Sequence, residues 1–279
     1  MRLCDFMRKS YRVLKEVGID QPIFDTRFLT AQALQCDRAA LLAQAERDLT
    51  DEEQAAIQTL ITRRANRESV ARILGERDFW GLSFALNEAT LEPRPDSETL
   101  IEAALHFCQK HAAISILDLG TGSGCLLLAL LSALPASKGL GIDQSPRALE
   151  QAQLNAKNLG FESRANFLQS HWLDNVEGLF DLIVSNPPYI KTQDLKTLQR
   201  EVRDYDPHLA LDGGEDGLDA YRTLIPQLKN HMKKNALLLF EVGASQAPQV
   251  SALLEKEGFS DIRFHKDLNI INRVVSARN

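Results

Sequence analysis

The stretch ISILDLGTGSGC, residues 114–125, joins a short apolar run to a glycine-rich turn and the start of a second apolar run. The first run predicts a buried strand over Ile114–Leu119, and the second predicts a helix from about Cys125. In doubly wound α/β folds this kind of turn lies at the sheet edge where nucleotides bind. Glycines let the backbone approach a ligand closely, and N–H groups at the helix start remain free to bind polar atoms.

The spacing of the turn is G-x-G-x-G, whereas the dinucleotide motif G-x-G-x-x-G would need glycine where this chain has Cys125. Asp143 ends the next predicted strand, roughly 20 residues further on, where a carboxylate can accept bonds from both ribose hydroxyls. A tight turn with a capping acid is the alternative interpretation. The combination favours a ligand that contains adenosine, and the candidate cofactor contacts are Gly120, Thr121, Gly122, Ser123, Gly124 and Asp143.

Beyond this turn, predicted strands alternate with predicted helices. The further strands are 139–142, 165–168, 180–185, 236–242, 262–265 and 271–277, and the helices are 146–159, 218–233 and 247–256. Apolar strands that alternate with helices indicate a mainly parallel sheet covered on both faces. No helix separates the last two strands, so we expect them to be antiparallel. The fold class is therefore α/β with a doubly wound sheet.

The N-terminal part predicts helices only. Residues 3–74 contain few turn signals and no strand-like alternation, which indicates a bundle of four or five helices. Thr50 and Glu53 form a capping box ahead of one of these helices. Another helix begins at Pro22 and is expected to present one apolar face made of Phe24, Phe28 and Ala31.

A short connection leads from this bundle to the alternating region. Turn residues within 78–91 predict a hairpin, and the prolines at 93 and 95 force an extended backbone. Asp96 or Ser97 can then cap a helix that starts at Glu98. We divide the chain into a helical bundle at 1–75, which we expect to recognise a partner, a hairpin linker at 76–92, and a C-terminal domain at 93–279.

The charge is unevenly distributed over the 279 residues. The net formal charge is −6, residues 1–80 carry 13 basic and 13 acidic side chains, and residues 81–279 carry 19 and 25. Non-specific affinity for nucleic acid comes mostly from Lys and Arg that neutralise phosphates. Nucleic acid is therefore the less favoured partner of the acidic C-terminal part.

The composition also bears on compartment and metal binding. The longest apolar run, residues 125–131, is too short to cross a bilayer, and the N-terminus shows no secretory signal. The four cysteines form no C-x-x-C pair and the histidines no H-E-x-x-H pattern. We expect a cytoplasmic protein without a metal site.

The tetrapeptide NPPY, residues 186–189, follows the predicted strand 180–185 and therefore stands at the same sheet edge as the glycine turn. The two prolines stiffen the backbone and remove two N–H donors, which leaves carbonyl groups to point outward. The Asn186 side chain and the Pro187 backbone then offer two acceptors for the hydrogens of a planar –NH2 group. The Tyr189 ring can stack on that group or enclose it. A polyproline-like turn without function is the alternative.

Such an arrangement suits methylation of an amide or an exocyclic amine. The nitrogen of these groups is a poor nucleophile because its lone pair is delocalised. Acceptors that bind both N–H groups favour a pyramidal nitrogen and direct its lone pair at an electrophile, which lowers the barrier. A sulfonium methyl held in line would supply the electrophile, and no dedicated general base is required before transfer.

With these motifs the chain resembles the peptide chain release factor N5-glutamine methyltransferases, which use S-adenosylmethionine. The resemblance covers essentially the whole chain and rests on the N-terminal helical segment and on ILGERDFWGLSF (73–84), LEPRPDSE (91–98), FDLIVSNPPYI (180–190), ALDGGEDGLDAYR (210–222) and FEVG (240–243). It implies a seven-stranded class I methyltransferase-like sheet with a small N-terminal helical bundle.

The resemblance also implies an activity. These enzymes methylate the side-chain amide of the Gln in the Gly-Gly-Gln motif of bacterial class 1 release factors and release S-adenosylhomocysteine. By resemblance, residues 120–124 and Asp143 hold the donor, and Trp172 packs near its adenine. Asn186 touches both donor and amide, and three residues complete the glutamine pocket: Pro187, Pro188 and Tyr189. The catalytic residues are then Asn186, Pro187 and Tyr189, and we expect a monomer that needs no membrane and no nucleic acid.

The sequence departs from relatives at two places. His171 stands where relatives often carry an acid before the aromatic residue, so adenine recognition differs locally, or His171 is a solvent-facing loop residue. In LEPRPDSE, Glu92 and Ser97 replace an aliphatic residue and a threonine. The segment either lines the donor pocket or acts only as a rigid linker and helix cap. Glu241 is interpreted as a hydrogen-bonded structural acid, and a role in the site is the alternative because it lies near the sheet edge.

Two other functions compete. An N6-adenine methyltransferase acting on DNA or RNA would use N-P-P-Y equally well, but the acidic C-terminal part and the absence of a recognisable nucleic-acid module argue against it. A binding protein that kept the cofactor fold without activity has no need for the acceptor geometry of N-P-P-Y. Glutamine methylation is the favoured hypothesis.

Overall fold

The computed structural model describes residues 1–108 and 113–279, which form two compact units. The first, the helical unit, comprises residues 1–75 and 199–205. The second, the sheet unit, comprises residues 76–198 and 206–279. The chain thus returns to the helical unit for one short segment after it has begun the sheet unit.

The helical unit packs five N-terminal helices around its own core and includes one short later helix. Its helices are α1 (Leu3–Glu16), α2 (Pro22–Ala33), α3 (Arg38–Ala43), α4 (Asp51–Ala65), α5 (Val70–Leu74) and α9 (Arg200–Arg203). The core consists mainly of aliphatic side chains from α1, α2 and α4 and the loops between them. Thr50 and Glu53 form the expected capping box at the start of α4, with each side chain bonded to the other residue's backbone N–H.

The expected apolar face of α2 is wrong. Phe24 is 48% exposed, and the buried residues of this helix are Asp25, Thr26, Leu29, Thr30 and Ala31. The reason is that Asp25 forms an ion pair with Arg64 of α4, at 2.7 Å between Oδ2 and Nε. A paired carboxylate can be buried, so the inward face of α2 is partly polar.

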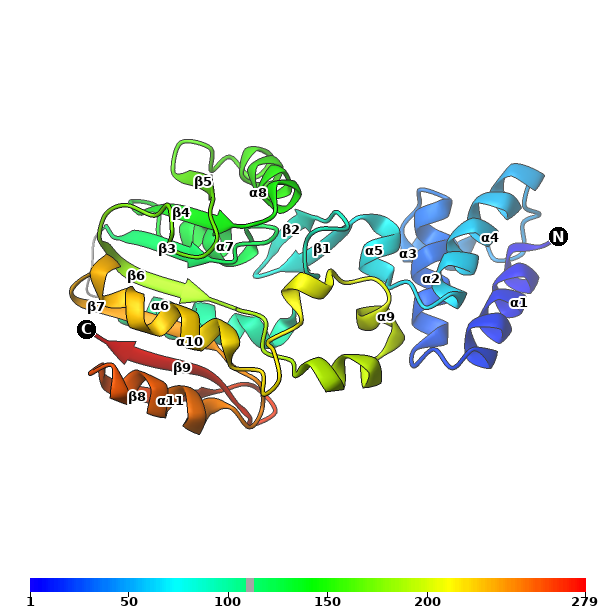
Figure 1. Cartoon of the computed structure of the whole chain (residues 1–279). Helices are drawn as coiled ribbons and strands as arrows, with labels where there is room; N and C mark the ends of the chain where they lie inside the picture. The colour runs from blue at the N-terminus through cyan, green and yellow to red at the C-terminus, as the bar shows by residue number, and fades with distance from the viewer. Residues whose placement is uncertain (109–112) are drawn as a thin grey trace. The chain divides into compact units, whose positions relative to one another are not determined.

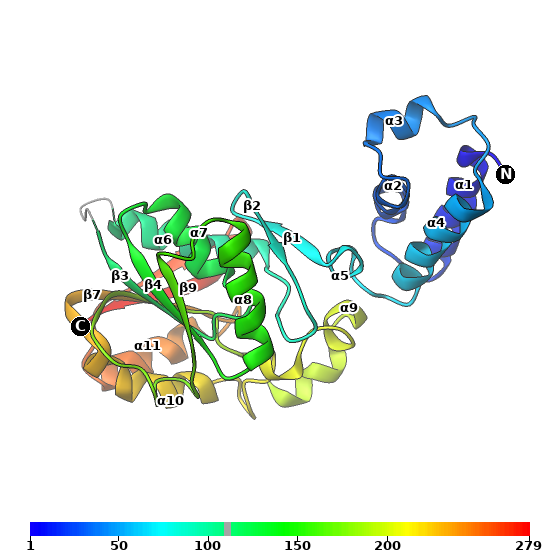
Figure 2. The same ribbon diagram turned by 90° about the horizontal axis from the view of Figure 1, so that it is seen from above.

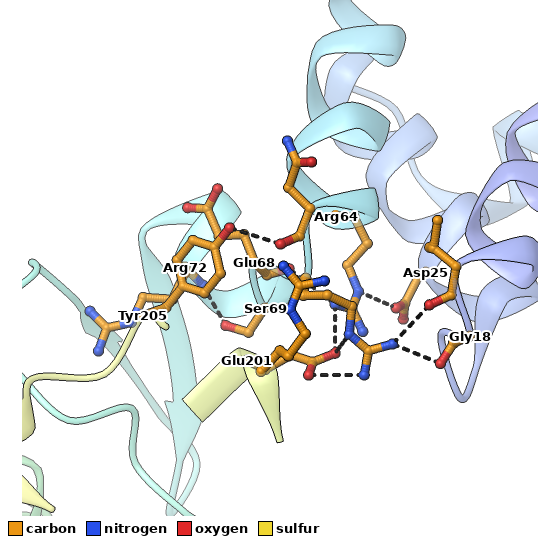
Figure 3. A network of polar contacts seen from close by, with 12 residues as sticks. Gly18, Asp25, Arg64, Glu68, Ser69, Arg72, Glu201 and Tyr205 are labelled. Atoms are coloured by element: carbon orange, nitrogen blue, oxygen red, sulfur yellow. Dashed lines mark hydrogen bonds and ion pairs between the residues drawn. The ribbon is translucent and has the colours of Figure 1, made fainter. Parts of the chain in front are cut away.

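A polar network holds the segment Gln199–Tyr205 within the helical unit (Figure 3). Arg64 donates from Nη1 to Oε1 of Glu201 at 3.1 Å, and Arg67 donates from Nη2 to Oε2 at 3.0 Å. The Tyr205 hydroxyl donates to the backbone oxygen of Asn66 at 3.0 Å. The side chains of Arg64 and Glu201 are only 10% and 15% exposed, so this is a largely desolvated ion pair rather than a surface contact.

The sheet unit contains a seven-stranded sheet and a separate hairpin. The hairpin pairs β1 (Glu76–Phe79) with β2 (Leu82–Ala85) through a turn in which Trp80 and Gly81 have positive φ. The large sheet has the order β5-β4-β3-β6-β7-β9-β8. Its strands are β3 (Ser115–Leu119), β4 (Lys138–Asp143), β5 (Ala165–Gln169), β6 (Phe180–Ser185), β7 (Met232–Glu241), β8 (Ser260–Lys266) and β9 (Asn272–Arg278).

Six strands of this sheet run in the same direction, five of them as parallel neighbours, and only β9 runs antiparallel, between β7 and β8. This confirms the doubly wound α/β fold and the antiparallel pairing of the last two strands. Helices cover both faces (Figures 1 and 2), with α10 and α11 on one side and α6 and α7 on the other. These helices are α6 (Glu98–Cys108), α7 (Cys125–Ala133), α8 (Pro146–Asn158), α10 (Asp219–Leu228) and α11 (Ala247–Lys256).

The strands serve two cores because alternate side chains point to opposite faces. In β3, Leu117 and Leu119 join the core under α10 and α11, whereas Ile116 joins the core under α6 and α7. In β6, Ile183 joins the core under α10 and α11, and Leu182 joins the core under α6 and α7. Burial on both faces explains why these strands are continuous apolar runs in the sequence.

Two neighbouring expected boundaries are wrong. The predicted helix 218–233 ends at Leu228, a 3₁₀ turn η4 spans Lys229–His231, and β7 begins at Met232 instead of residue 236. Met232 is 3% exposed and already pairs with Phe180 of β6. The next residues, KKN at 233–235, conceal the strand because they break its apolar pattern, although Lys233 is held by an ion pair to Asp181.

Candidate functional site

The register of the sheet brings three separate sequence motifs to one edge. In the parallel ladders, Leu119 of β3 pairs with Ile142 of β4 on one side and with Ser185 of β6 on the other. The residues that follow these strand positions are Gly120, Asp143 and Asn186. They therefore emerge side by side at the carboxyl edge, where doubly wound folds bind their ligands.

A cavity of about 180 Å³ lies at this edge. Eight of the predicted site residues line it, namely Gly120, Thr121, Gly122, Ser123, Asp143, Trp172, Asn186 and Pro188. Three others, Gly124, Pro187 and Tyr189, are not part of the lining. The cavity is also lined by residues outside the set of predicted site residues: Ala89, Leu91, Pro93, Arg94, Ser97, Cys125, Leu126, Ile142, Gln144, Ser145, Ser170, His171, Pro207, Leu209 and Ala210.

The glycine turn has the backbone that its sequence requires. Gly120, Gly122 and Gly124 all have positive φ, a backbone conformation that residues with a Cβ atom rarely adopt. At Gly124 a Cβ atom would also lie 3.3 Å from side-chain atoms of Leu128 and Ala152. Gly124 thus allows α7 to start against α8, while Gly120 and Gly122 present backbone to the cavity.

Asp143 stands at the cavity with both carboxylate oxygens already oriented. The backbone N–H of Gly122 donates to its Oδ2 at 3.0 Å, and that of Ser145 donates to its Oδ1 at 2.9 Å. Burial raises the pKa of this carboxyl, and the two hydrogen bonds oppose that rise. Each carboxylate oxygen can accept a second bond, so Asp143 can still bind two ligand hydroxyls.

A second acid, Asp118, supports the turn from below and is fully buried. The Thr121 hydroxyl donates to its Oδ2 at 2.7 Å. Burial raises the pKa of Asp118 to about 7, against the lowering effect of that hydrogen bond. Its Oδ1 has no hydrogen-bond partner within the described part of the chain, so Asp118 is a structural acid whose charge is poorly compensated.

His171 and Trp172 form one wall of the cavity. Trp172 has a positive φ of 49°, and a Cβ atom on Gly120 would lie 3.7 Å from its ring. The His171 side chain is 62% exposed and its Nδ1 lies 3.4 Å from the Asp174 carboxylate. His171 therefore both faces solvent and borders the cavity.

The segment LEPRPDSE also reaches the cavity. Pro93, Arg94 and Ser97 all line it, and Ser97 ends the 3₁₀ turn η1 (Pro95–Ser97) just before α6. Asn186 donates from its side-chain Nδ2 to the Ser97 Oγ at 3.3 Å. Arg94 is held by an ion pair to the buried Asp206, at 2.5 Å. Of the two roles considered for this segment, the cavity wall is the one that its position supports.

Tyr189 points to a buried acid. Its hydroxyl donates to Oε1 of Glu241 at 3.3 Å, and burial raises the pKa of the tyrosine. Glu241, at the end of β7, is 1% exposed, and burial raises its pKa to about 7. Hydrogen bonds from Ser97 and Tyr189 and the charge of Arg273 oppose this rise.

Several supporting residues were missed by sequence reasoning. The Gln246 Nε2 donates to the backbone oxygens of Tyr189 and Gly217, at 2.9 and 3.0 Å. A Cβ atom on Gly217 would lie 2.4 Å from the Tyr189 oxygen, and one on Gly213 would lie 2.8 Å from the Pro188 oxygen. The acidic glycine-rich turn at 213–217 therefore packs against the N-P-P-Y backbone. Its glycines were the available signal, because close backbone packing requires them.

The same edge thus combines a side that suits a nucleoside-containing ligand, the donor side, and a side that suits a substrate amide or amine, the acceptor side. Backbone N–H groups, a carboxylate and an indole can bind a nucleoside, and an amide oxygen beside them can accept a bond from a substrate N–H. No group of three or more His, Cys, Asp or Glu side chains in residues 1–108 and 113–279 is arranged to hold a metal ion. Over those same ranges, no helix combines the length and hydropathy needed to cross a bilayer.

Two family models match the chain. One, described as "PrmC N-terminal domain", matches residues 5–75, and the other, "Methyltransferase small domain", matches residues 97–216. The two matched ranges lie mainly in the helical unit and in the sheet unit, respectively.

Solved structures share the fold of the sheet unit. A methyltransferase from Pyrococcus furiosus superposes with a TM-score of 0.55 at 16% identity, over 78% of this chain and 98% of its own. The 16S rRNA N2 G1207 methyltransferase of T. thermophilus, in complex with AdoMet and guanosine, gives a TM-score of 0.52 at 17% identity, over 73% of this chain and 49% of its own. At this identity they establish a methyltransferase-like fold.

Sequence relatives match nearly the whole chain. The release factor glutamine methyltransferase of Rhodospirillum rubrum is 46% identical over 99% of this chain and 84% of its own length. The proteins of the same description from Bradyrhizobium diazoefficiens and Cereibacter sphaeroides are 46% and 41% identical, over 95% and 100% of this chain and 91% and 99% of theirs. The chain therefore belongs to the family of release factor glutamine methyltransferases.

Proposed function

We propose that this protein transfers a methyl group from S-adenosylmethionine to the side-chain amide nitrogen of the Gln in the Gly-Gly-Gln motif of class 1 release factors. The observation that carries the proposal is the juxtaposition of Asp143, the glycine turn and Asn186 around one cavity. Membership of the family supports the choice of a release factor glutamine over an adenine as acceptor.

The donor side of the cavity fits S-adenosylmethionine. Asp143 would bind the ribose hydroxyls, and the turn at residues 120–124 would approach the donor with its backbone. Trp172 would pack on the adenine, with His171 at its solvent edge. When bound, the donor supplies an electrophilic methyl group on a sulfonium. Asp118 supports this turn from below through its hydrogen bond with the Thr121 hydroxyl.

The acceptor side acts on the glutamine amide. Asn186 Oδ1 and the Pro187 backbone oxygen would each accept one N–H of the amide, which turns the nitrogen lone pair toward the methyl group. Tyr189 and Pro188 would limit the freedom of the amide plane. Both acceptors bind the nitrogen more strongly as it becomes positive, so they lower the barrier. The N–C bond forms as the S–CH3 bond breaks, the thioether product S-adenosylhomocysteine leaves, and one amide proton passes to water, so the reaction balances.

We further propose a division of labour along the chain. Residues 93–279 would form the catalytic domain, the hairpin at 76–92 would link it to the bundle, and residues 1–75 would contact the release factor away from its glutamine. An exposed apolar group in the helical unit supports that contact: Ile23, Phe24 and Leu42 are 53%, 48% and 62% exposed and border a common hollow. Solvent-exposed apolar groups of this kind often mark protein contacts.

The remaining expectations follow from this function. Because the proposed substrate is a protein, the reaction requires no nucleic acid, and the net charge of −6 disfavours its binding. We propose that the chain acts as a monomer in the cytoplasm, where translation termination takes place. Light scattering of the purified protein would measure its oligomeric state.

A labelled methyl donor tests the proposed acceptor directly. The protein would be incubated with the donor and with one of three substrates, namely a class 1 release factor, the same factor with Gln→Ala in its Gly-Gly-Gln motif, and duplex DNA. We expect label only on the unaltered release factor. Label on DNA with none on the release factor would establish the adenine alternative instead.

A further inference from the structure

A chain of hydrogen bonds joins both ends of the N-P-P-Y motif to one buried acid. Asn186 donates from Nδ2 to the Ser97 Oγ at 3.3 Å, and the Tyr189 hydroxyl donates to Glu241 Oε1 at 3.3 Å. Ser97 links the two, because its hydroxyl lowers the pKa of the Glu241 carboxyl as a hydrogen-bond donor. Ser97 and Glu241 are 4% and 1% exposed. The side chains of Asn186 and Tyr189 are therefore held by Ser97 of η1, which lines the cavity, and by Glu241 of β7, which is not part of the lining.

The serine determines which way the asparagine amide faces. A hydroxyl has a single proton, and Ser97 uses it as a donor to the Glu241 carboxylate. The Ser97 oxygen can then only accept from Asn186, so the Asn186 –NH2 is turned to Ser97 and Oδ1 is turned away from it. This is the orientation in which Oδ1 can accept an N–H from a glutamine amide.

Glu241 is itself firmly positioned. The buried Tyr221 of α10 donates from its hydroxyl to the Glu241 backbone oxygen at 2.7 Å. Glu241 Oε2 has no hydrogen-bond partner among the residues that the structure describes. The acid thus keeps unused acceptor capacity while it receives bonds from both Ser97 and Tyr189.

The charged and titratable groups around Glu241 come from five elements. Arg273 of β9 and Asp96 of η1 act on it with opposite signs, Tyr189 and Tyr221 face it from the N-P-P-Y loop and α10, and the thiol of Cys125 faces it from α7. Arg273 is also shared, because its Nη2 lies 3.0 Å from Asp96 and 3.2 Å from Asp267. The positive charge available to Glu241 is therefore divided among three carboxylates.

We propose that Ser97 and Glu241 are positioning residues for methyl transfer, which together fix the Asn186 amide with its carbonyl oxygen toward the substrate glutamine. The inference rests on the proposed function, because it assigns these residues to the acceptor side of that reaction. Neither residue touches the reacting atoms, and both act through Asn186 and Tyr189.

The proposal predicts a pH dependence with a definite sign. Ionised Glu241 accepts from Ser97 and keeps the amide correctly oriented. Protonated Glu241 can donate to Ser97, whose proton can then go to Asn186 Oδ1 and turn the amide around. Because burial raises the pKa of Glu241 to about 7, kcat should be high above that pH and fall as the pH decreases through it.

Four variants of the full-length protein test the proposal, with kcat and KM for the release factor, donor affinity and melting temperature measured for each. Ser97→Ala removes the hydroxyl and should lower kcat at least about tenfold, while donor affinity changes less than about twofold. Ser97→Thr keeps the hydroxyl and should retain most of kcat. Glu241→Gln should lower kcat and abolish its decline near pH 7. Ser251→Ala, at a buried serine of α11, is the matched control and should behave as wild type.

The outcomes separate this proposal from the proposed function. Wild-type kcat in Ser97→Ala, or equal losses in Ser97→Ala and Ser97→Thr, would overturn the positioning role. An unchanged acid-side decline in Glu241→Gln would overturn the role of that acid. If Glu241→Gln does not fold, the pair of Ser97 variants decides the matter. A wild-type protein that binds donor but methylates no release factor would instead refute the proposed function.

Discussion

At the level of single residues, the proposed acceptor mechanism depends most on the side chain of Asn186. It lines the cavity, and its –NH2 is engaged by Ser97, so the proposal assigns the role of acceptor to Oδ1. We expect Asn186→Ala to lower transfer to the release factor by about 100-fold or more, since an oriented acceptor is lost. Donor affinity, measured by calorimetry, should be retained in part.

Asn158→Ala, at an exposed position of α8, is the control for the Asn186 variant and should leave transfer unchanged. Turnover at the wild-type rate in Asn186→Ala would remove this residue from the mechanism.

Asp118 provides a test of stability against pH. Its pKa is raised to about 7 by burial, so the folded state holds a proton that the unfolded chain loses near pH 4. Binding of this proton contributes fully to the free energy of unfolding below about pH 4. The contribution declines by at most about 1.4 kcal/mol per pH unit as the pH rises, and it is lost above about pH 7. Asp118→Asn cannot titrate, so its melting temperature relative to wild type should rise between pH 4.5 and 7.5. A constant difference across that range would refute the raised pKa.

Some residues at the cavity could be predicted from sequence patterns, and others could not. The glycine turn, Asp143 and N-P-P-Y carry their signal in residue type and spacing, and all three emerge at one edge because strand order places them there. Ser97, Gln246 and Glu241 were not identified as partners of this motif. Their roles depend on contacts between segments far apart in the chain, and such contacts leave no periodic pattern.

At the level of elements, we expect the ion pairs of the segment Gln199–Tyr205 to stabilise the helical unit. Glu201 pairs with Arg64 and Arg67 where all three side chains are at most 16% exposed. Breaking a buried ion pair leaves uncompensated charge, so Glu201→Ala should lower the melting temperature of the helical unit by about 5 to 15 °C. Asp204→Ala, at a more exposed acid in the same segment, is the matched control and should shift it far less. Similar shifts in both variants would mean that the Glu201 network is not stabilising.

Element types were predicted better than element limits. Every strand of the large sheet was expected, and burial on both faces makes β3 and β6 especially visible as apolar runs. The limits of α10 and β7 were wrong because a 3₁₀ turn and the polar residues 233–235 lie between helix and strand. The buried face of α2 was also wrong, because the Asp25–Arg64 ion pair turns a charged residue inward.

At the level of the whole molecule, two units imply two kinds of contact with a protein substrate. If Ile23 and Leu42 contact the release factor, the double variant Ile23→Asp/Leu42→Asp should raise KM for the intact factor about tenfold, which corresponds to the loss of about 1.4 kcal/mol. Its kcat/KM for a short Gly-Gly-Gln peptide should stay within about twofold of wild type, because the cavity is unaltered.

Leu154→Asp, at an exposed leucine of α8, is the control for that double variant and should affect neither substrate. An equal loss with peptide and intact factor would show that the helical unit does not act in recognition. The sequence indicated a separate N-terminal bundle, but nothing in its pattern indicated that residues 199–205 belong to the same unit, since that pairing depends on Glu201 meeting two distant arginines.

The central claim is that the cavity directs a methyl group to one amide nitrogen of a release factor. Peptide mapping by mass spectrometry, after the factor has been incubated with this protein and S-adenosylmethionine, tests it most directly. We predict a single added methyl group, located on the side chain of the Gly-Gly-Gln glutamine. A methyl group on any other residue, or an unmodified factor in the presence of bound donor, would contradict the account.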